Sequence, residues 1–263
     1  MVIKSDEEIE LIRISSLMVS KTLAYLGSIL EVGLTPYELN LKAEEFLKDN
    51  KAIPSFKGYR GFPSALCVSR NEAVVHGIPD KLPFKETDIV SIDCGAYING
   101  YHGDSAYTFA FSEVSNEVKD LLFTTKESLL RGLAILKAGV RQGDLGFEIQ
   151  SFCEDRGYSI VRELVGHGLG KSIHEPPDVP NYGKKGKGLI FKKNLVIAVE
   201  PMVNLGKKEV IMLDDDWTIV TKDSMPSAHF EHTVCVKLEG CDILTSFDPI
   251  EKSIEKNNNL INI

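Results

Sequence analysis

Four acidic side chains stand in or beside apolar stretches, and this pattern restricts what the chain can fold into more than any other. Asp93 follows Ile-Val-Ser-Ile, Glu200 follows Val-Ile-Ala-Val, and Asp104 and Glu231 also sit in weakly polar surroundings. Burying a carboxylate costs several kcal/mol unless positive charge compensates it. No run of Lys or Arg adjoins these acids. Metal ions are therefore their most economical partner, and they make hydrolysis feasible at neutral pH.

The histidines gather around the same segments. All six lie within or next to the acidic or glycine-rich motifs: His76, His102, His167, His174, His229 and His232. Glycines on both sides of His167 argue against a helix and let the backbone approach a ligand closely. Carboxylates with one or two imidazoles suit Mn, Fe, Co or Zn. We therefore expect a single two-metal site formed by Asp93, Asp104, His167, Glu200 and Glu231.

The alternative for each acid is a buried ion pair with arginine. Arg60, Arg70 and Arg141 are available elsewhere in the chain, so this alternative stays open residue by residue. If it held for all four acids, the chain would be a metal-free acidic binding protein. Because there is no Cys-x-x-Cys pair, a structural zinc site is not expected.

Bulk composition bounds the class of protein. The chain has 263 residues, 43% apolar residues and a net charge of −8, which argues against nucleic acid as the main partner. Five cysteines form an odd count, the start is charged, and no run approaches ~18 apolar residues. These features predict a cytoplasmic protein without a membrane span. One catalytic domain is expected over residues 1–250, followed by a loosely ordered tail at 251–263.

Periodicity predicts an ordered series of elements. Helices are expected over 5–27, 36–49, 115–137 and 143–155, and strands over 64–69, 88–97, 101–111, 158–165, 194–200, 209–213, 217–221 and 229–237. Thr35-Pro-Tyr-Glu38 is a capping box that opens the second helix. The order helix, glycine, helix, then strands occurs twice, which indicates two related halves.

A tight hairpin brings two of the acids together. Asn99-Gly100 is the strongest short hairpin signal, and it joins the strands that carry Asp93 and Asp104. With these two residues as the loop, Asp104 lies opposite Gly95, and Asp93 is its diagonal neighbour on the same face, within ~8 Å at the backbone. Two like charges so placed repel unless a cation lies between them.

These motifs, taken in order, resemble a known family. They are Asn71–Pro79 with His76, Ile92-Asp93, Gly103-Asp104, Gly166-His167-Gly-Leu-Gly170, His174-Glu-Pro176, Val199-Glu200-Pro201 and Phe230-Glu231-His232-Thr233. The set is similar to methionine aminopeptidase of type I, in the M24 metallopeptidases, and covers nearly the whole chain. The resemblance implies the α/β (α+β) pita-bread fold, with two pseudo-symmetric halves around a central antiparallel sheet and helices on its outer face.

The resemblance also implies roles for the site residues. Asp93 would bind one divalent ion, His167 and Glu200 the other, and Asp104 and Glu231 would bridge both; Co, Mn, Fe and Zn all stay open. A water between the ions would attack the carbonyl of the first residue of the substrate, with Glu200 shuttling the proton. His174 would stabilise the oxyanion, and His76 would contact the scissile amide or the substrate backbone.

The implied methionine pocket is apolar, and aromatic residues and a cysteine are among the residues that line it. The matching residues are Phe56, Tyr59, Phe62, Cys67, Ile173 and Trp217. The chain departs from the family at three of its positions. His229 stands where the family usually has Gln, and Phe56 and Ile173 replace residues that are often Cys and Phe. The first departure puts metal preference in question, and the others put pocket shape in question.

The expected function is removal of the initiator methionine from nascent proteins, with preference for a small second residue. The enzyme would act as a monomer near the ribosome. Two rivals share the fold: an Xaa-Pro peptidase and a catalytically inactive binding module. Xaa-Pro peptidases usually carry an extra N-terminal domain, and inactive modules typically lose metal ligands, whereas this chain keeps all five.

Overall fold

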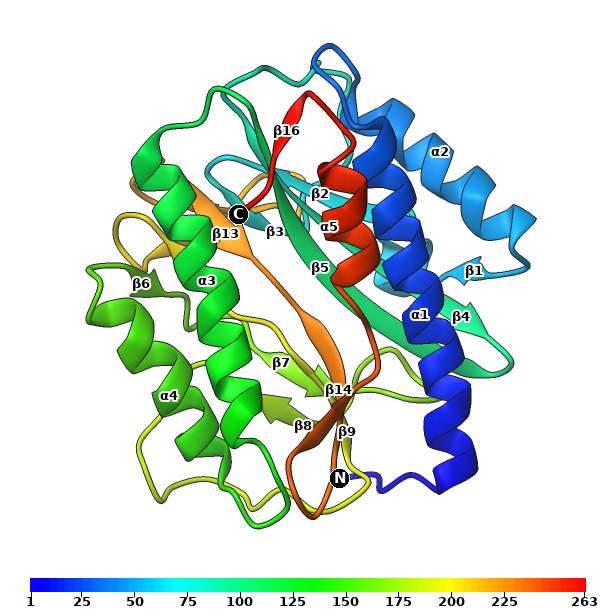
Figure 1. Cartoon of the computed structure of the whole chain (residues 1–263), viewed down its shortest axis with the longest axis vertical. Coiled ribbons are helices and arrows are strands. Elements are labelled where there is room, and N and C mark those ends of the chain that lie inside the picture. Colours follow the sequence, from blue (N-terminus) through cyan, green and yellow to red (C-terminus); the bar gives the residue numbers. More distant parts are fainter.

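The computed structural model describes residues 1–263, with helices covering one face of a set of antiparallel sheets (Figure 1). The helices are α1 (Asp6–Ile29), α2 (Pro36–Asp49), α3 (Asn116–Ile135), α4 (Gln142–Glu154) and α5 (Asp248–Ile254), with a short 3₁₀ turn at Tyr59–Gly61. In Figure 1, α1 and α2 lie on one side and α3 and α4 on the other, with α5 beside α1. None of the helices combines the length and apolarity needed to cross a bilayer.

The strands form four hydrogen-bonded sheets, and every pairing in them is antiparallel. The first sheet contains β1 (Ile53–Pro54), β4 (Ile89–Ile98), β5 (Tyr101–Phe111), β16 (Leu260–Ile261) and β2 (Leu66–Arg70). The second contains β13 (Ser227–His229), β10 (Met202–Asn204) and β6 (Ser159–Ile160). The third contains β11 (Val210–Met212), β12 (Ile219–Thr221) and β3 (Ala73–Val75). The last contains β15 (Cys241–Ile243), β14 (His232–Val236), β9 (Val196–Val199), β7 (Gly166–Gly168) and β8 (Glu175–Val179).

The two helical pairs begin and turn as the sequence predicts. The Thr35 side chain accepts from the backbone of Glu38, whose carboxylate bonds back to the Thr35 backbone, so the predicted capping box is confirmed. Gly33 lies between α1 and α2 with φ +93°, and Gly139 lies between α3 and α4 with φ +95°. Both glycines therefore adopt the left-handed conformation in the turn that follows each helix, which a residue without a side chain does at little cost. The repeat of helix, glycine and helix is thus a structural repeat.

The β4–β5 hairpin has the predicted turn and register. Asn99 and Gly100 both have positive φ, 52° and 87°, which is typical of a type I′ turn. Gly95 pairs with Asp104 in the ladder, and Asp93 lies two residues further along, opposite Ala106. The turn chemistry alone therefore places both carboxylates on one face of the hairpin.

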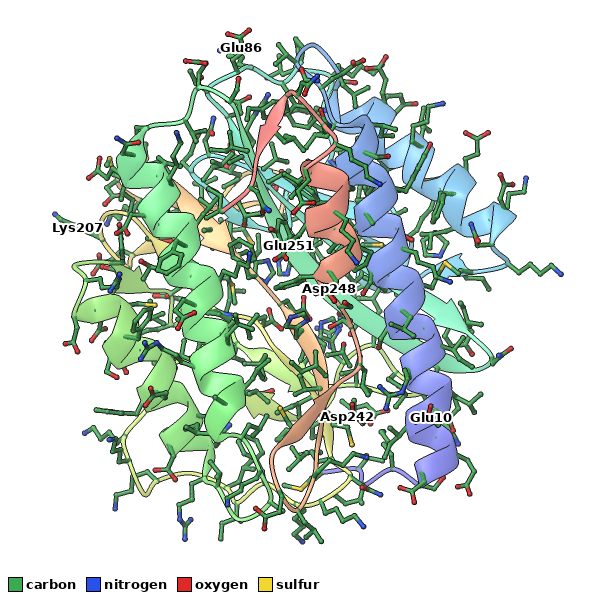
Figure 2. All side chains as sticks on the ribbon, viewed as in Figure 1. Glu10, Glu86, Lys207, Asp242, Asp248 and Glu251 are labelled. Carbon is green, nitrogen blue, oxygen red and sulfur yellow. The ribbon has the colours of Figure 1, made fainter.

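The core joins both ends of the chain. One cluster of 45 buried apolar residues includes members from α1 through to β16. On the surface, Arg13 forms ion pairs with Glu10 on α1 and Asp242 on β15, two acids that lie close to each other in Figure 2. The expected strand over 158–165 is limited to the two residues of β6, and those at 209–213 and 217–221 are shorter as β11 and β12.

The prediction of a loosely ordered tail is wrong. The expected boundary at residue 250 falls inside α5, and β16 pairs with the end of β5. Asn257 donates hydrogen bonds to the carbonyls of Gly27 and Leu30, which are left unpaired at the end of α1. Capping another helix gives this polar segment an order that its own composition does not indicate.

Helix α1 crosses β5 at backbone contact, just before Asp104. A Cβ atom placed on Gly103 would collide with the Ser16 nitrogen and would lie 2.5 Å from the Ser15 carbonyl carbon. These are backbone atoms inside a helix, so a side chain here requires the helix to move.

We expect Gly103→Ala to lower the free energy of unfolding by about 1–3 kcal/mol, because overpacking forces the backbone apart. Urea denaturation of the metal-free protein measures this change. Leu82→Ala is the control, since Leu82 is 63% exposed and its loss changes stability by within about 0.5 kcal/mol. Equal stability of the two variants would contradict the close crossing.

Candidate metal centre

Two segments from opposite halves of the chain lie side by side and carry the acids. The Thr108 hydroxyl accepts from the His229 nitrogen at 2.9 Å and donates to the His229 carbonyl at 2.7 Å. Two residues further, the Glu231 nitrogen donates to the Ala106 carbonyl at 2.9 Å. Strand β5 and residues 229–233 are thereby joined along their length, and we call this contact the seam.

Hydroxyl groups complete the seam next to the acids themselves. The Thr233 hydroxyl donates to the Asp104 carbonyl at 2.7 Å and accepts from the Asp104 nitrogen at 3.3 Å. The Ser105 hydroxyl donates to the Glu231 carbonyl at 2.6 Å. The backbones that carry Asp104 and Glu231 are therefore fixed relative to each other, although the two residues are 127 positions apart in sequence.

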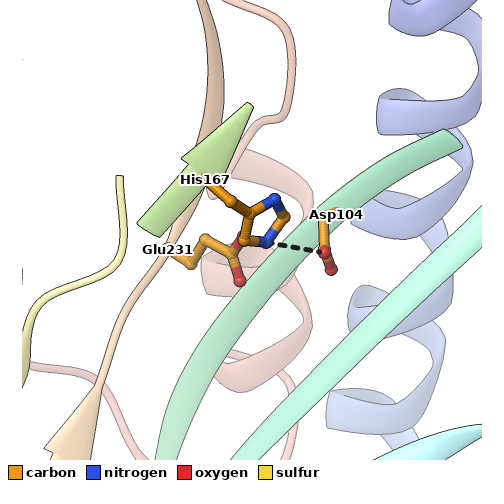
Figure 3. Close-up of side chains that lie close together, drawn as sticks. All are labelled: Asp104, His167 and Glu231. Atoms are coloured by element: carbon orange, nitrogen blue, oxygen red, sulfur yellow. Dashed lines mark ion pairs between the residues drawn. The ribbon is translucent and has the colours of Figure 1, made fainter. Parts of the chain in front are cut away.

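Three of the five expected ligands converge on one point. Donor atoms of Asp104, His167 and Glu231 lie within 4.8 Å of one another, and all three residues are buried. Figure 3 shows a ring nitrogen of His167 facing the Asp104 carboxylate, at 3.7 Å from Nε2 to Oδ2, with Glu231 alongside. His167 Nδ1 bonds the Gly168 carbonyl at 2.9 Å and must be the donor there. In the neutral ring this leaves the Nε2 lone pair facing the carboxylates, which suits a cation between them.

The other two expected ligands adjoin this group. Glu200 Oε1 lies 3.5 Å from His167 Nε2. Asp93 is the diagonal neighbour of Asp104 on one face of the hairpin, and both residues border the same cavity. All five expected ligands thus meet at one place, with the first two from the hairpin and the others from β7, the end of β9 and the seam.

The carboxylates lack the compensation that their burial requires. Burial and the neighbouring carboxylates raise the pKa of Asp104, Glu200 and Glu231 well above the usual range. Burial raises the pKa of Asp93 to about 7. The ion pairs of Asp104 and Glu200 involve imidazoles, and none joins any of the four acids to Lys or Arg. The open alternative of arginine pairing is therefore wrong.

Unpartnered oxygens point to what completes the site. Asp93 Oδ1, Asp104 Oδ1 and Glu231 Oε1 are buried and have no hydrogen-bond partner. Such groups are rare in folded proteins unless an ion or water satisfies them. Several carboxylates and one imidazole fit a divalent cation of hard or borderline character.

The cluster forms one wall of a cavity of about 530 Å³. Five of the six expected pocket residues line it: Phe56, Tyr59, Phe62, Cys67 and Trp217. Ile173 packs in the same apolar cluster but does not line the cavity. Cys67 lies opposite Asp93 in the sheet, and burial raises the pKa of its thiol, so it contributes an apolar lining. The cavity is therefore acidic on one side and apolar on the other.

Two further histidines line the cavity as the sequence predicts. His76 has φ +59°, a strained value for a residue with a side chain, and such strain gathers at functional sites. The ring of His174 lies 4.2 Å from that of His167 and 5.1 Å from that of Tyr59. Burial and the neighbouring imidazole of His167 lower the pKa of His174, so it is a neutral donor at pH 7.

The other histidines have different surroundings. His102 bonds Ser55 through Nδ1 at 2.9 Å, and His232 bonds Thr245 at 2.7 Å. Neither lines the cavity, so nearness in sequence to a motif was misleading for both.

The hydroxyl groups of the seam, which belong to Ser105, Thr108 and Thr233, were not identified from the sequence. The sequence feature that could have indicated them is the presence of Ser and Thr in apolar strands beside the acids.

Comparisons with known proteins agree with this geometry. The model of metallopeptidase family M24 matches residues 10–237. Methionine aminopeptidase from Clostridium acetobutylicum is 46% identical over 245 residues, covering 93% of this chain and 98% of that protein. Methionine aminopeptidase 1 from Bacillus subtilis is 46% identical over 242 residues, covering 92% and 98%. The crystal structure of methionine aminopeptidase from Rickettsia prowazekii superposes with a TM-score of 0.92 at 34% identity, covering 94% and 100%. The chain therefore belongs to metallopeptidase family M24 and, within it, to the methionine aminopeptidases.

Proposed function

We propose that this chain removes the N-terminal methionine from polypeptides by hydrolysing the first peptide bond. The observation that carries this proposal is the convergence of Asp104, His167 and Glu231 within 4.8 Å on one wall of a cavity with an apolar far side. A metal-ligating wall next to an apolar pocket suits a substrate with a polar terminus and a thioether side chain.

Two divalent cations are proposed as the cofactor, held by the residues assigned from the sequence. Asp93 would hold one cation, His167 and Glu200 the other, and Asp104 and Glu231 would contact both. The unpartnered oxygens of Asp93, Asp104 and Glu231 support this assignment. When bound, such cations polarise a carbonyl and generate a nucleophile from water at neutral pH. The donor set suits Mn, Fe, Co or Zn.

The remaining steps belong to the side chains. Glu200, on the cavity wall, accepts the proton of the attacking water and passes it to the leaving nitrogen. His174 donates a hydrogen bond to the oxyanion that develops on the carbonyl oxygen. His76, also on the cavity wall, contacts the amide nitrogen or the substrate backbone. Phe56, Tyr59, Phe62, Cys67 and Trp217 receive the methionine side chain, with Ile173 supporting them from behind.

The rivals within the fold are less well supported. An inactive binding module would lack ligands, and the cluster of Asp104, His167 and Glu231 argues against that alternative. An Xaa-Pro peptidase is not favoured, because the relatives that are 46% identical over 92–93% of this chain are methionine aminopeptidases. Cleavage of Met-Ala-Ser but not Ala-Pro separates the two activities.

We also infer that the enzyme works in the cytoplasm as a monomer, on nascent chains close to the ribosome. The five free cysteines, which include four buried ones, support a reducing compartment. Analytical ultracentrifugation should give a mass near 29.1 kDa. Twice that mass at micromolar concentration would contradict the monomer.

We expect Asp104→Asn to reduce hydrolysis of Met-Ala-Ser to background and to lower the bound metal per chain, because the amide removes a charge common to both proposed cation positions. Peptide turnover and elemental analysis measure these effects. Glu10→Gln, on the exposed face of α1, is the control and should retain both.

The metal-free Asp104→Asn protein should be at least as stable as the wild type at pH 7. Because burial raises the pKa of Asp104, the folded state binds more protons than the unfolded state, and stability falls as pH rises above about 4. The variant loses that penalty. A marked loss of stability would mean that Asp104 has a cationic partner, and wild-type turnover would remove it from the site.

We expect His174→Ala to lower kcat by about 10²–10³-fold with a smaller change in KM, because the donor is needed most in the transition state. Steady-state kinetics with Met-Ala-Ser measures the split. The matched control is His102→Ala, whose ring bonds Ser55 outside the cavity. If both variants lose kcat equally, a general distortion explains the effect.

A further inference from the structure

His229 is a buried imidazole whose two ring nitrogens have no hydrogen-bond partner. Its side chain is 2% exposed, and both Nδ1 and Nε2 lack partners. The imidazole has at least one N–H to donate in either protonation state. A buried donor without an acceptor is costly, and it needs an explanation.

The nearest acceptor is the Glu200 carboxylate. His229 Nε2 lies 3.7 Å from Glu200 Oε2, about 0.7 Å longer than an ordinary N–H···O hydrogen bond. The other oxygen, Oε1, lies 3.5 Å from His167 Nε2. Glu200 therefore lies between two imidazoles: one belongs to the metal-ligating group, and the other does not line the cavity.

The backbone of His229 is fixed more firmly than its ring. Thr108 bonds both its nitrogen and its carbonyl, and the Thr108 hydroxyl also contacts the Ser91 hydroxyl at 2.8 Å. His229 pairs with Met202, which follows Glu200 by two residues. The seam and the β10–β13 ladder therefore set the position of His229 relative to Glu200.

We propose that His229 is a positioning residue for Glu200: its Nε2–H donates to Glu200 Oε2 and orients the carboxylate so that Oε1 faces the metal-ligating group. The proposal rests on the proposed metal site and goes beyond it, since the five ligands alone leave the outer oxygen of Glu200 without a donor. Hydrogen-bonded partners of this kind orient ligands and adjust metal affinity. His229 acts from behind Glu200 and is not itself a ligand.

The test compares His229→Gln with His229→Met. The two side chains have the same length, but only glutamine has an N–H donor. Mn²⁺ binding to the metal-free proteins is measured by calorimetry, and the electronic absorption of the Co²⁺-loaded proteins reports the geometry of the site. Thermal unfolding of the metal-free proteins reports structural damage.

We expect His229→Met to bind Mn²⁺ about 10–100-fold more weakly and to alter the Co²⁺ spectrum at unchanged stoichiometry. His229→Gln should restore both toward the wild type. Wild-type affinity and spectrum in His229→Met would overturn the proposal, as would equal weakening in both variants. Loss of one cation per chain in both would make His229 a ligand and would also overturn it.

Failure of this inference can be told from failure of the proposed function. If the wild type binds Mn²⁺ and cleaves Met-Ala-Ser while His229→Met matches it, only the role of His229 is rejected. If the wild type binds no divalent cation, the proposed metal site and the role of His229 fall together.

Discussion

The structure depends on placing several carboxylates of like charge inside the protein with no Lys or Arg to neutralise them. Repulsion among Asp93, Asp104, Glu200 and Glu231 opposes folding, as their raised pKa values indicate. Something rigid must hold the backbones together against it. The seam does so, since its hydrogen bonds run from backbone to backbone and from hydroxyl to backbone, leaving the carboxylate oxygens free. Binding of cations would relieve the repulsion, so part of the folding free energy would come from the ligand.

The two halves of the chain each supply helices, strands and expected ligands to the site. Each half contributes a pair of helices that covers one face of the sheets, and each ends in strands that reach the centre (Figure 1). The hairpin supplies Asp93 and Asp104, and the second half supplies the other three ligands. Groups mounted on paired strands are held more closely than groups on loops, and this favours a precise site. His174, Phe56 and Phe62 come from irregular segments of the chain.

Much of this arrangement could be predicted because local chemistry determines it. Asn99-Gly100 fixes the turn type, and the turn fixes which residues of the hairpin share a face. The caps of α2 and the paired glycines are likewise local signals. What escaped prediction depends on contacts between distant segments. Thr108 and Thr233 read as ordinary strand residues, and only the fold shows that they bond the opposite half. Asn257 orders the tail by capping α1, and Ile173 lies behind the pocket wall. Neither placement can be predicted from the spacing of apolar residues in the sequence.

The position of Glu231 in the chain has a consequence for biosynthesis. The strand that presents Asp104 is made well before its neighbour in the seam, because Thr233 follows Asp104 by 129 positions. A growing chain therefore contains Asp93 and Asp104 well before the other three expected ligands have been made. Premature capture of ions by the early acids would be weak, because the remaining donors are missing. The complete set of donors is consequently present only after Glu231 has been made.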